Sequence, residues 1–301
     1  MMNRSEFKDV IIEEIRRQFS EGYTVDVREV VKSNDVTNTG ITVTKIGSNV
    51  GATVYVENLY ERYRDLSSPE LIAEELKKSF IQESALEAEV PEFDKSFILD
   101  HVYYRMANTD TNQRRLADVP VQNVPGIEGV TLYPVIEVSI GNRRGTTIIH
   151  NDSLTNLDIS MDELHDAAMR NTEARIEIIP LADKLRGMVP EGMMEGFESP
   201  FLVASDRFSE QGGASAFAAP GAFAKLTESY YIIPSSVHEI LLLPVSFESD
   251  QDRLKSLVKE VNSDVLAPED VLSDKIYLVE DGKFSTLEGP EAEASNEYEN
   301  E

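Results

Sequence analysis

The residues with the clearest chemical potential lie in one short segment, residues 234–239, which reads Pro-Ser-Ser-Val-His-Glu. A serine hydroxyl, a histidine and a carboxylate are the ingredients of nucleophilic catalysis. The flanking apolar runs predict an extended turn, which places Ser236 and His238 on one face and Glu239 on the other. No Gly-x-Ser-x-Gly elbow is present to expose a nucleophile. We therefore interpret Ser235, Ser236 and His238 as a locally hydrogen-bonded turn, with catalysis as the alternative.

Other motifs for metals and cofactors are weak. The four histidines, at positions 101, 150, 165 and 238, do not have the spacing of helical zinc ligands, and a site assembled from distant segments stays open. The chain has no cysteine, which excludes disulfides, thiolate metal sites and a cysteine nucleophile. The glycines at 212, 213 and 221 match neither a Walker loop nor a dinucleotide fingerprint. No metal or cofactor is therefore predicted.

Two adjacent arginines, Arg143 and Arg144, form a small basic spot in an acidic protein. They lie in a short connection between two runs of strand-like residues, 131–140 and 146–149. A pair of guanidinium groups can bind an anion, and arginines in such a turn also commonly form surface ion pairs. Arg143 and Arg144 are therefore the candidate anion-binding residues of the sequence.

The charge balance restricts the partners that this protein can have. The 301 residues include 55 acidic and 28 basic side chains, which gives a net charge of −27. Such a surface repels phosphate backbones and anionic lipid surfaces, which disfavours direct nucleic-acid and membrane binding. The same surface can keep a protein soluble, or can imitate nucleic acid toward a DNA-binding protein. We expect a protein partner, and the sequence predicts neither its identity nor the oligomeric state.

The sequence also bears on cellular location. No apolar run approaches the ~20 residues that span a bilayer. The first residues lead directly into a polar helical pattern and lack the apolar region of a secretory signal. Together with the absence of cysteine, these features predict a cytoplasmic protein.

Periodic patterns predict an irregular mixture of helices and short strands. Ser160 and Glu163 form a capping box before an amphipathic helix, and Ser68-Pro69 is typical of a helix start. The remaining predicted elements are a first helix after Ser5, strands at 23–31, 41–46, 52–56, 99–106, 201–204, 230–233, 237–243 and 275–279, and a helix from about 249 to 261. Short connections between strands favour an α+β fold with largely antiparallel sheets.

We expect two α+β regions, residues 1–120 and 121–280, which could form one continuous domain. A glycine- and proline-rich stretch at 187–200 predicts a mobile loop or an alternative boundary. Residues 281–301 are acidic and poor in apolar side chains, which predicts a disordered tail.

Two longer motifs carry a resemblance to a known family. Residues 231–240 read Tyr-Ile-Ile-Pro-Ser-Ser-Val-His-Glu-Ile, and residues 267–277 read Ala-Pro-Glu-Asp-Val-Leu-Ser-Asp-Lys-Ile-Tyr. With the arrangement of the N-terminal half, the chain resembles an uncharacterised bacterial family, the domain-of-unknown-function family numbered fifty-six eighty-eight. The resemblance implies an origin in anaerobic gut bacteria, often near mobile elements. It implies no activity and no functional residues.

Three functional hypotheses follow. The first is a non-catalytic interaction or accessory protein of a bacterial mobile element. The second is an acidic inhibitor that mimics nucleic acid against a defence or regulatory protein. The third is a small-molecule enzyme or binding protein that uses Ser236 and His238, or the arginine pair.

Overall fold

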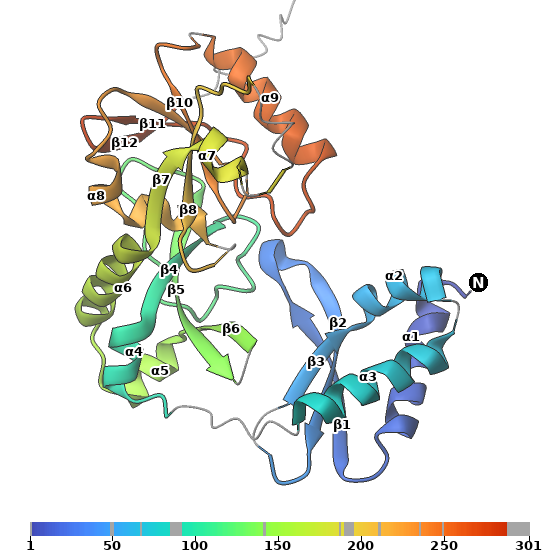
Figure 1. Ribbon diagram of the computed structural model, residues 1–301. Helices are drawn as coiled ribbons and strands as arrows, with labels where there is room; N and C mark the ends of the chain where they lie inside the picture. The colour runs from blue at the N-terminus through green and yellow to red at the C-terminus, as the bar shows by residue number, and fades with distance from the viewer. Residues whose placement is uncertain are drawn as a thin grey trace, which may run out of the picture. The chain divides into compact units, whose positions relative to one another are not determined.

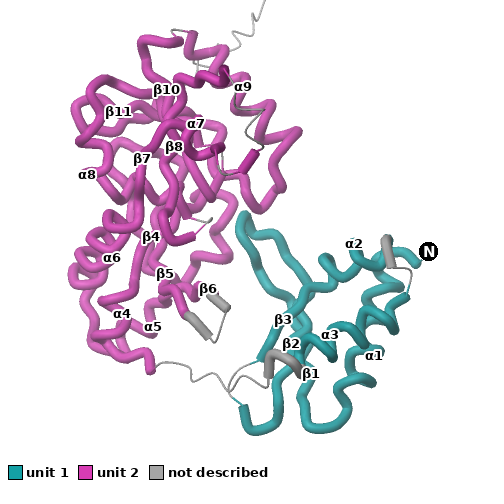
Figure 2. Tube along the Cα trace, in the orientation of Figure 1, with its two compact units in different colours: residues 1–91, 139–143 teal, residues 92–138, 144–301 magenta. Residues whose placement is uncertain are grey.

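The chain folds into two compact units. The computed structural model describes residues 2–48, 51–66, 68–84, 92–140, 143–186, 188–189, 196–209, 212–234, 236–248 and 250–287. Unit 1 comprises residues 1–91 and 139–143, and unit 2 comprises residues 92–138 and 144–301 (Figure 2). The expected boundary near residue 120 falls inside unit 2, between strands β4 (Val102–Asn108) and β5 (Val130–Ile140). These two strands pair along their length, so the chain divides at residue 91 instead.

The described part of unit 1 contains a three-stranded antiparallel sheet and three α-helices. Its sheet has the order β1-β2-β3, and Ile41 lies opposite Val27 on one side and Val54 on the other. Its elements are α1 (Arg4–Gln18), β1 (Tyr23–Val31), β2 (Thr37–Lys45), β3 (Gly51–Tyr55), α2 (Val56–Leu66) and α3 (Pro69–Ser84) (Figure 1). The first helix is capped by Asn3, in a capping box with Glu6, and begins earlier than the pattern after Ser5 indicates.

The core of unit 1 forms where the helices meet one face of the sheet. Phe7 and Ile11 of α1 pack with Ile41 of β2 and Ile72 of α3, and all four side chains are buried. The opposite face of the sheet is polar, since Thr42 and Thr53 join their hydroxyl groups across the strands at 2.8 Å. The period-2 alternation of the strands therefore correctly separated core from surface.

Unit 2 holds two further sheets. One has the order β4-β5-β6, and the other has the order β12-β11-β9-β10-β8-β7. The elements of unit 2 are α4 (Lys95–His101), β4, β5, β6 (Arg143–Ile148), α5 (Asn151–Asn156), α6 (Met161–Arg175), β7 (Ile176–Pro180), α7 (Leu181–Leu185), β8 (Leu202–Asp206), α8 (Pro220–Phe223), β9 (Tyr230–Ile233), β10 (Ile240–Pro244), α9 (Gln251–Asp264), β11 (Tyr277–Glu280) and β12 (Lys283–Thr286). The strand pairings in both units are antiparallel wherever their register is defined, which confirms the α+β fold.

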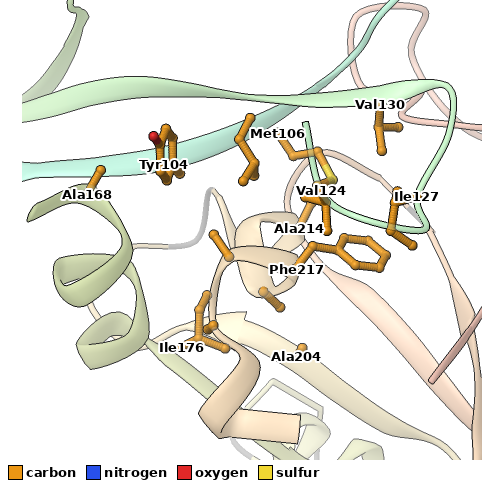
Figure 3. Packing of buried hydrophobic residues seen from close by; sticks show 14 of the residues in the cluster. Tyr104, Met106, Val124, Ile127, Val130, Ala168, Ile176, Ala204, Ala214 and Phe217 are labelled. Atoms are coloured by element: carbon orange, nitrogen blue, oxygen red, sulfur yellow. The ribbon is translucent and has the colours of Figure 1, made fainter. Parts of the chain in front are cut away.

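The main core of unit 2 joins its two sheets. Tyr104 and Met106 of β4 face Phe217 and Ala204, which lie on the other side of the same apolar cluster (Figure 3). Phe217 belongs to a tight 3-10 turn, Gly213–Ala218, in which every residue is buried. A Cβ atom at Gly213 would lie 2.6 Å from the carbonyl oxygen of His238 and 2.7 Å from Cα of Ser205. The small residues of this run therefore allow backbones to approach closely.

Two segments of unit 2 differ in type of structure from the sequence-based expectation. The segment predicted as a strand from Leu99 begins as helix α4, because Asp94 caps it by accepting a hydrogen bond from the backbone N–H of Phe97. The expected tail from residue 281 continues as β12, which pairs with β11. Phe284 in this strand packs against Phe217 and Phe223, with ring centroids 5.3 and 5.0 Å apart. Residues 288–301 lie outside the described residues.

Among the helices that the structure describes, none combines the length and the apolar character needed to cross a bilayer.

Candidate functional site

The structure brings Ser236 and His238 together through the backbone. The Ser236 hydroxyl accepts a hydrogen bond from the backbone N–H of His238 at 3.0 Å, and Ser236 is buried. The backbone N–H of Ser236 donates to the carbonyl oxygen of Glu239 at 3.3 Å. Ser235 lies outside the described residues. This is the geometry of a hydroxyl that stabilises a turn, as the first interpretation of the segment predicts.

The carboxylate partner of His238 is Asp270, and not the neighbouring Glu239. Nε2 of the imidazole lies 3.1 Å from Oδ1 of Asp270, and both side chains are about one third exposed. The backbone reinforces this pairing, because Val237 donates to the carbonyl oxygen of Asp270 at 3.0 Å. The two segments that carry the family resemblance, 231–240 and 267–277, therefore meet at this hydrogen-bonded contact.

The other ring nitrogen of His238, Nδ1, faces away from solvent. Nδ1 is buried and has no hydrogen-bond partner among the described residues. The carbonyl oxygen of the same residue accepts from the backbone N–H of Gly213 at 2.6 Å. A histidine and a carboxylate in this arrangement can exchange a proton, yet the Ser236 hydroxyl is directed at the backbone.

The arginine pair lies in a different element from the one predicted. Arg143 and Arg144 form the first two residues of β6, and not part of the connection before it. Their side chains are outside what the structure describes, so their role in anion binding stays a prediction.

A second polar site, missed by the sequence analysis, lies around the last residue of α6. We call Tyr103, Arg105, Glu137, Arg175 and Asp206 the Arg175 cluster. Nε of Arg175 donates to Oδ2 of Asp206 at 2.8 Å, and its Nη2 donates to Oε2 of Glu137 at 3.0 Å. The guanidinium also lies over the ring of Tyr103, 4.0 Å from its centroid. The side chains of Arg175 and Asp206 are only 14% and 2% exposed.

Burial and charge act against each other in this cluster. Burial alone would lower the pKa of Arg175, but the hydrogen bond and charge of Asp206, with Tyr103 and Glu137, raise it above its ordinary value. Burial raises the pKa of Tyr103, and the nearby charges of Arg105 and Arg175 oppose that shift. The hydroxyl of Tyr103 and Nε of Arg105 are buried without a hydrogen-bond partner among the described residues. The cluster thus holds a fixed ion-pair network beside two unsatisfied donors.

Sequence patterns reach only part of this cluster. Alternation along the strand correctly places Tyr103 and Arg105 on one face, opposite Tyr104 and Met106. The ion pairs of Arg175 connect residues 31 and 38 positions apart, for which a single sequence gives no signal.

The described residues contain no group of three or more histidine, aspartate or glutamate side chains that could hold a metal ion.

Comparison with known proteins gives a family without an assigned activity. No curated protein and no solved structure matches the chain. The sequence profile of the family of unknown function DUF5688 matches residues 4–280, which is nearly the whole chain. The chain therefore belongs to this family of unknown function.

Proposed function

We propose that this protein is a non-catalytic interaction protein that binds a basic protein partner, in the role of an accessory protein of a bacterial mobile element. The carrying observation is the surplus of carboxylates. With 55 acidic and 28 basic side chains, 55 − 28 = 27 acidic groups would remain even if every cation were paired once. A partner that presents lysine and arginine gains electrostatic attraction and a faster encounter with such a surface.

Ion pairs within the chain support this proposal. Many described cations already have an acidic partner within the chain; examples are Arg16 with Glu13, Arg62 with Glu75, Lys78 with Glu74 and Lys275 with Glu128. These pairs are largely exposed, so each contributes little to stability. These pairs matter more for binding than for stability. They neutralise cations of the chain, so the remaining carboxylates dominate the electrostatic field around the protein.

The outer side of α9 offers an apolar contact within this acidic surface. Leu254 and Val258 on the inner side of the helix are buried, whereas Leu257 is 52% exposed. Val261 follows Leu257 by one turn, and the carboxylates of Glu260 and Asp264 lie on the same side of the helix by their spacing. A large exposed aliphatic side chain that is followed on its own face by two carboxylates suits a partner surface that combines apolar and cationic residues.

The test is a capture experiment with the full chain as bait in lysate of its own host cell. A partner of the proposed kind binds stoichiometrically, is released at high salt, and is lost with Leu257→Ser. The matched control is Leu71→Ser, because Leu71 lies on a helix of unit 1 and is 54% exposed, nearly as much as Leu257. Capture that both variants retain, or that high salt does not weaken, would contradict the proposal.

Mimicry of nucleic acid is the second candidate function, and the same carboxylate surplus favours it. It makes a different prediction for the captured partner. A mimic binds a DNA-binding protein, and duplex DNA competes with it for that protein. If DNA does not displace the captured partner, the protein does not act as a nucleic-acid mimic toward it. The accessory role then remains.

A further inference from the structure

Two buried donors of the Arg175 cluster have no acceptor among the residues that the structure describes. Tyr103 is 1% exposed, and neither its hydroxyl nor Nε of Arg105 has a hydrogen-bond partner in the part of the chain that the structure describes. Both side chains leave the same face of β4, because residues two apart on a strand share a face. Buried polar groups in folded proteins are almost always paired. These two donors on one face of β4 therefore need acceptors that the described residues do not supply.

The acceptors within the cluster are already engaged. Oδ2 of Asp206 accepts from Arg175, and its Oδ1 accepts from the backbone N–H of Phe208, both at 2.8 Å. Oε2 of Glu137 accepts from Arg175 at 3.0 Å. By contrast, no hydrogen bond or ion pair joins Arg105 to another described residue. Arg105 is thus a half-buried cation beside carboxylates that Arg175 already holds.

Gly212 leaves space next to the unpaired arginine. Its φ of +103° lies in the left-handed region that favours glycine. A Cβ atom at this position would lie 3.6 Å from Nε of Arg105 and 4.0 Å from Oδ2 of Asp206. The backbone therefore comes close to the guanidinium without placing a side chain over it.

We propose that Tyr103 and Arg105 bind the carboxylate of a small monoanionic ligand. A carboxylate is planar and has two oxygens that accept hydrogen bonds, which matches a guanidinium and a hydroxyl on the same face of one strand. The charge of the cluster selects a monoanion over a phosphate dianion. Arg105 and Arg175 balance Glu137 and Asp206 to zero, so a dianion would bring twice the negative charge close to two carboxylates.

The probe is acetate, and the readout is the NMR signal of the Arg105 Nε–Hε group in the full chain. The signal is assigned by its loss in Arg105→Lys. Titration with sodium acetate is expected to shift it to saturation, while sodium chloride at the same ionic strength does not. Tyr103→Phe removes only the hydroxyl and is expected to weaken acetate binding roughly tenfold. The matched control Tyr104→Phe, on the opposite face of the same strand, is expected to leave the affinity unchanged.

Several outcomes would overturn the proposal. An Arg105 signal that does not move to saturation with acetate would exclude a carboxylate site, and an equal response to chloride would reduce it to general screening. Tighter binding of inorganic phosphate would exclude the monoanion. A further variant, Glu210→Gln, removes a carboxylate two positions before Gly212 in the sequence. Acetate binding that appears only in this variant would mean that the chain supplies its own carboxylate.

Discussion

The Ser236–His238 turn and the Arg175 cluster each pair a side-chain nitrogen with a carboxylate. The pair in the turn is partly exposed, and the Arg175–Asp206 pair is largely buried. In the turn, hydrogen bonds connect residues two and three positions apart, and the His238–Asp270 pair is about one third exposed. In the cluster, Arg175 holds two carboxylates from β5 and β8 and is almost withdrawn from water. Exposed pairs contribute little to stability, whereas a buried charge that loses its partner is strongly destabilising. The segment with the more suggestive sequence is therefore the energetically weaker of the two.

The largest expected effect is on the Arg175 cluster. Arg175→Met leaves the buried Asp206 and the partly buried Glu137 without their cation and is expected to lower the free energy of unfolding by about 3 kcal/mol. Urea denaturation measures this. Arg253→Met is the control, because Arg253 is exposed and its ion pair with Glu248 is long, at 3.8 Å. If Arg175→Met does not fold, Arg175→Lys keeps the charge and is expected to lose less. Equal losses for Arg175→Met and the control would remove the contrast between the two regions.

Alkaline pH is expected to have the next largest effect, through buried tyrosines. Burial raises the pKa of Tyr104 and of Tyr277 to about 12, whereas an unfolded tyrosine titrates near pH 10. Between pH 10 and 12 the unfolded chain loses protons that the folded chain keeps, so stability present below pH 10 is lost as pH rises. Titration of the two tyrosines is expected to lower the free energy of unfolding by about 2 kcal/mol between pH 10 and 11. Tyr277→Phe should reduce this pH dependence of the unfolding free energy. An unchanged dependence would contradict the raised pKa of Tyr277.

In the turn, Ser236→Ala removes the acceptor of the His238 backbone N–H. The expected loss is about 1 kcal/mol, the usual contribution of one hydrogen bond. Ser256→Ala on α9 is the control, because this exposed hydroxyl donates to the Asp252 carbonyl oxygen of its own helix. Partner capture should be the same for Ser236→Ala and for the unaltered protein. Lost capture in a variant that remains folded would instead give the hydroxyl a functional role.

Tyrosines on the two faces of β4 should respond in opposite directions. The hydroxyl of Tyr103 has no described partner, so Tyr103→Phe is expected to raise the free energy of unfolding of the ligand-free protein by up to about 1 kcal/mol. The hydroxyl of Tyr104 bonds to Nδ1 of His165 at 3.0 Å, so Tyr104→Phe is expected to lower it by about the same amount. Thermal or urea denaturation of the pair measures the difference. Two losses of equal size would mean that Tyr103 has a partner after all.

The smallest expected effect is that of Asp270→Asn. The pair with His238 is exposed enough to be screened, and an asparagine oxygen can still accept from Nε2. We expect a change below about 0.5 kcal/mol in urea denaturation. A loss as large as that of Arg175→Met would show that the turn is as strongly coupled as the cluster.

Local patterns predicted the elements well wherever the deciding interactions were themselves local. Ser160 and Glu163 form the expected capping box, with hydrogen bonds between residues three positions apart. Strand β12 was missed because Phe284 stands alone in an acidic composition, and only its contacts with Phe217 and Phe223 show that it belongs to the core. The turn at Asp281 and Gly282, both with positive φ, brings this strand back against β11.

By itself the sequence determined the acidic character, the absence of cysteine chemistry, the α+β class and the assignment of Ser236 to a turn. Each of these depends on composition or on residues close together in the chain. Tertiary structure decided which charges are buried together. Arg175 meets Asp206 and Glu137 only because α6, β8 and β5 pack around one core, and within the described part of the chain the same packing gives the Tyr103 hydroxyl and Nε of Arg105 no acceptor. Long-range pairing of this kind depends on three-dimensional proximity, which a single sequence does not encode in any local pattern.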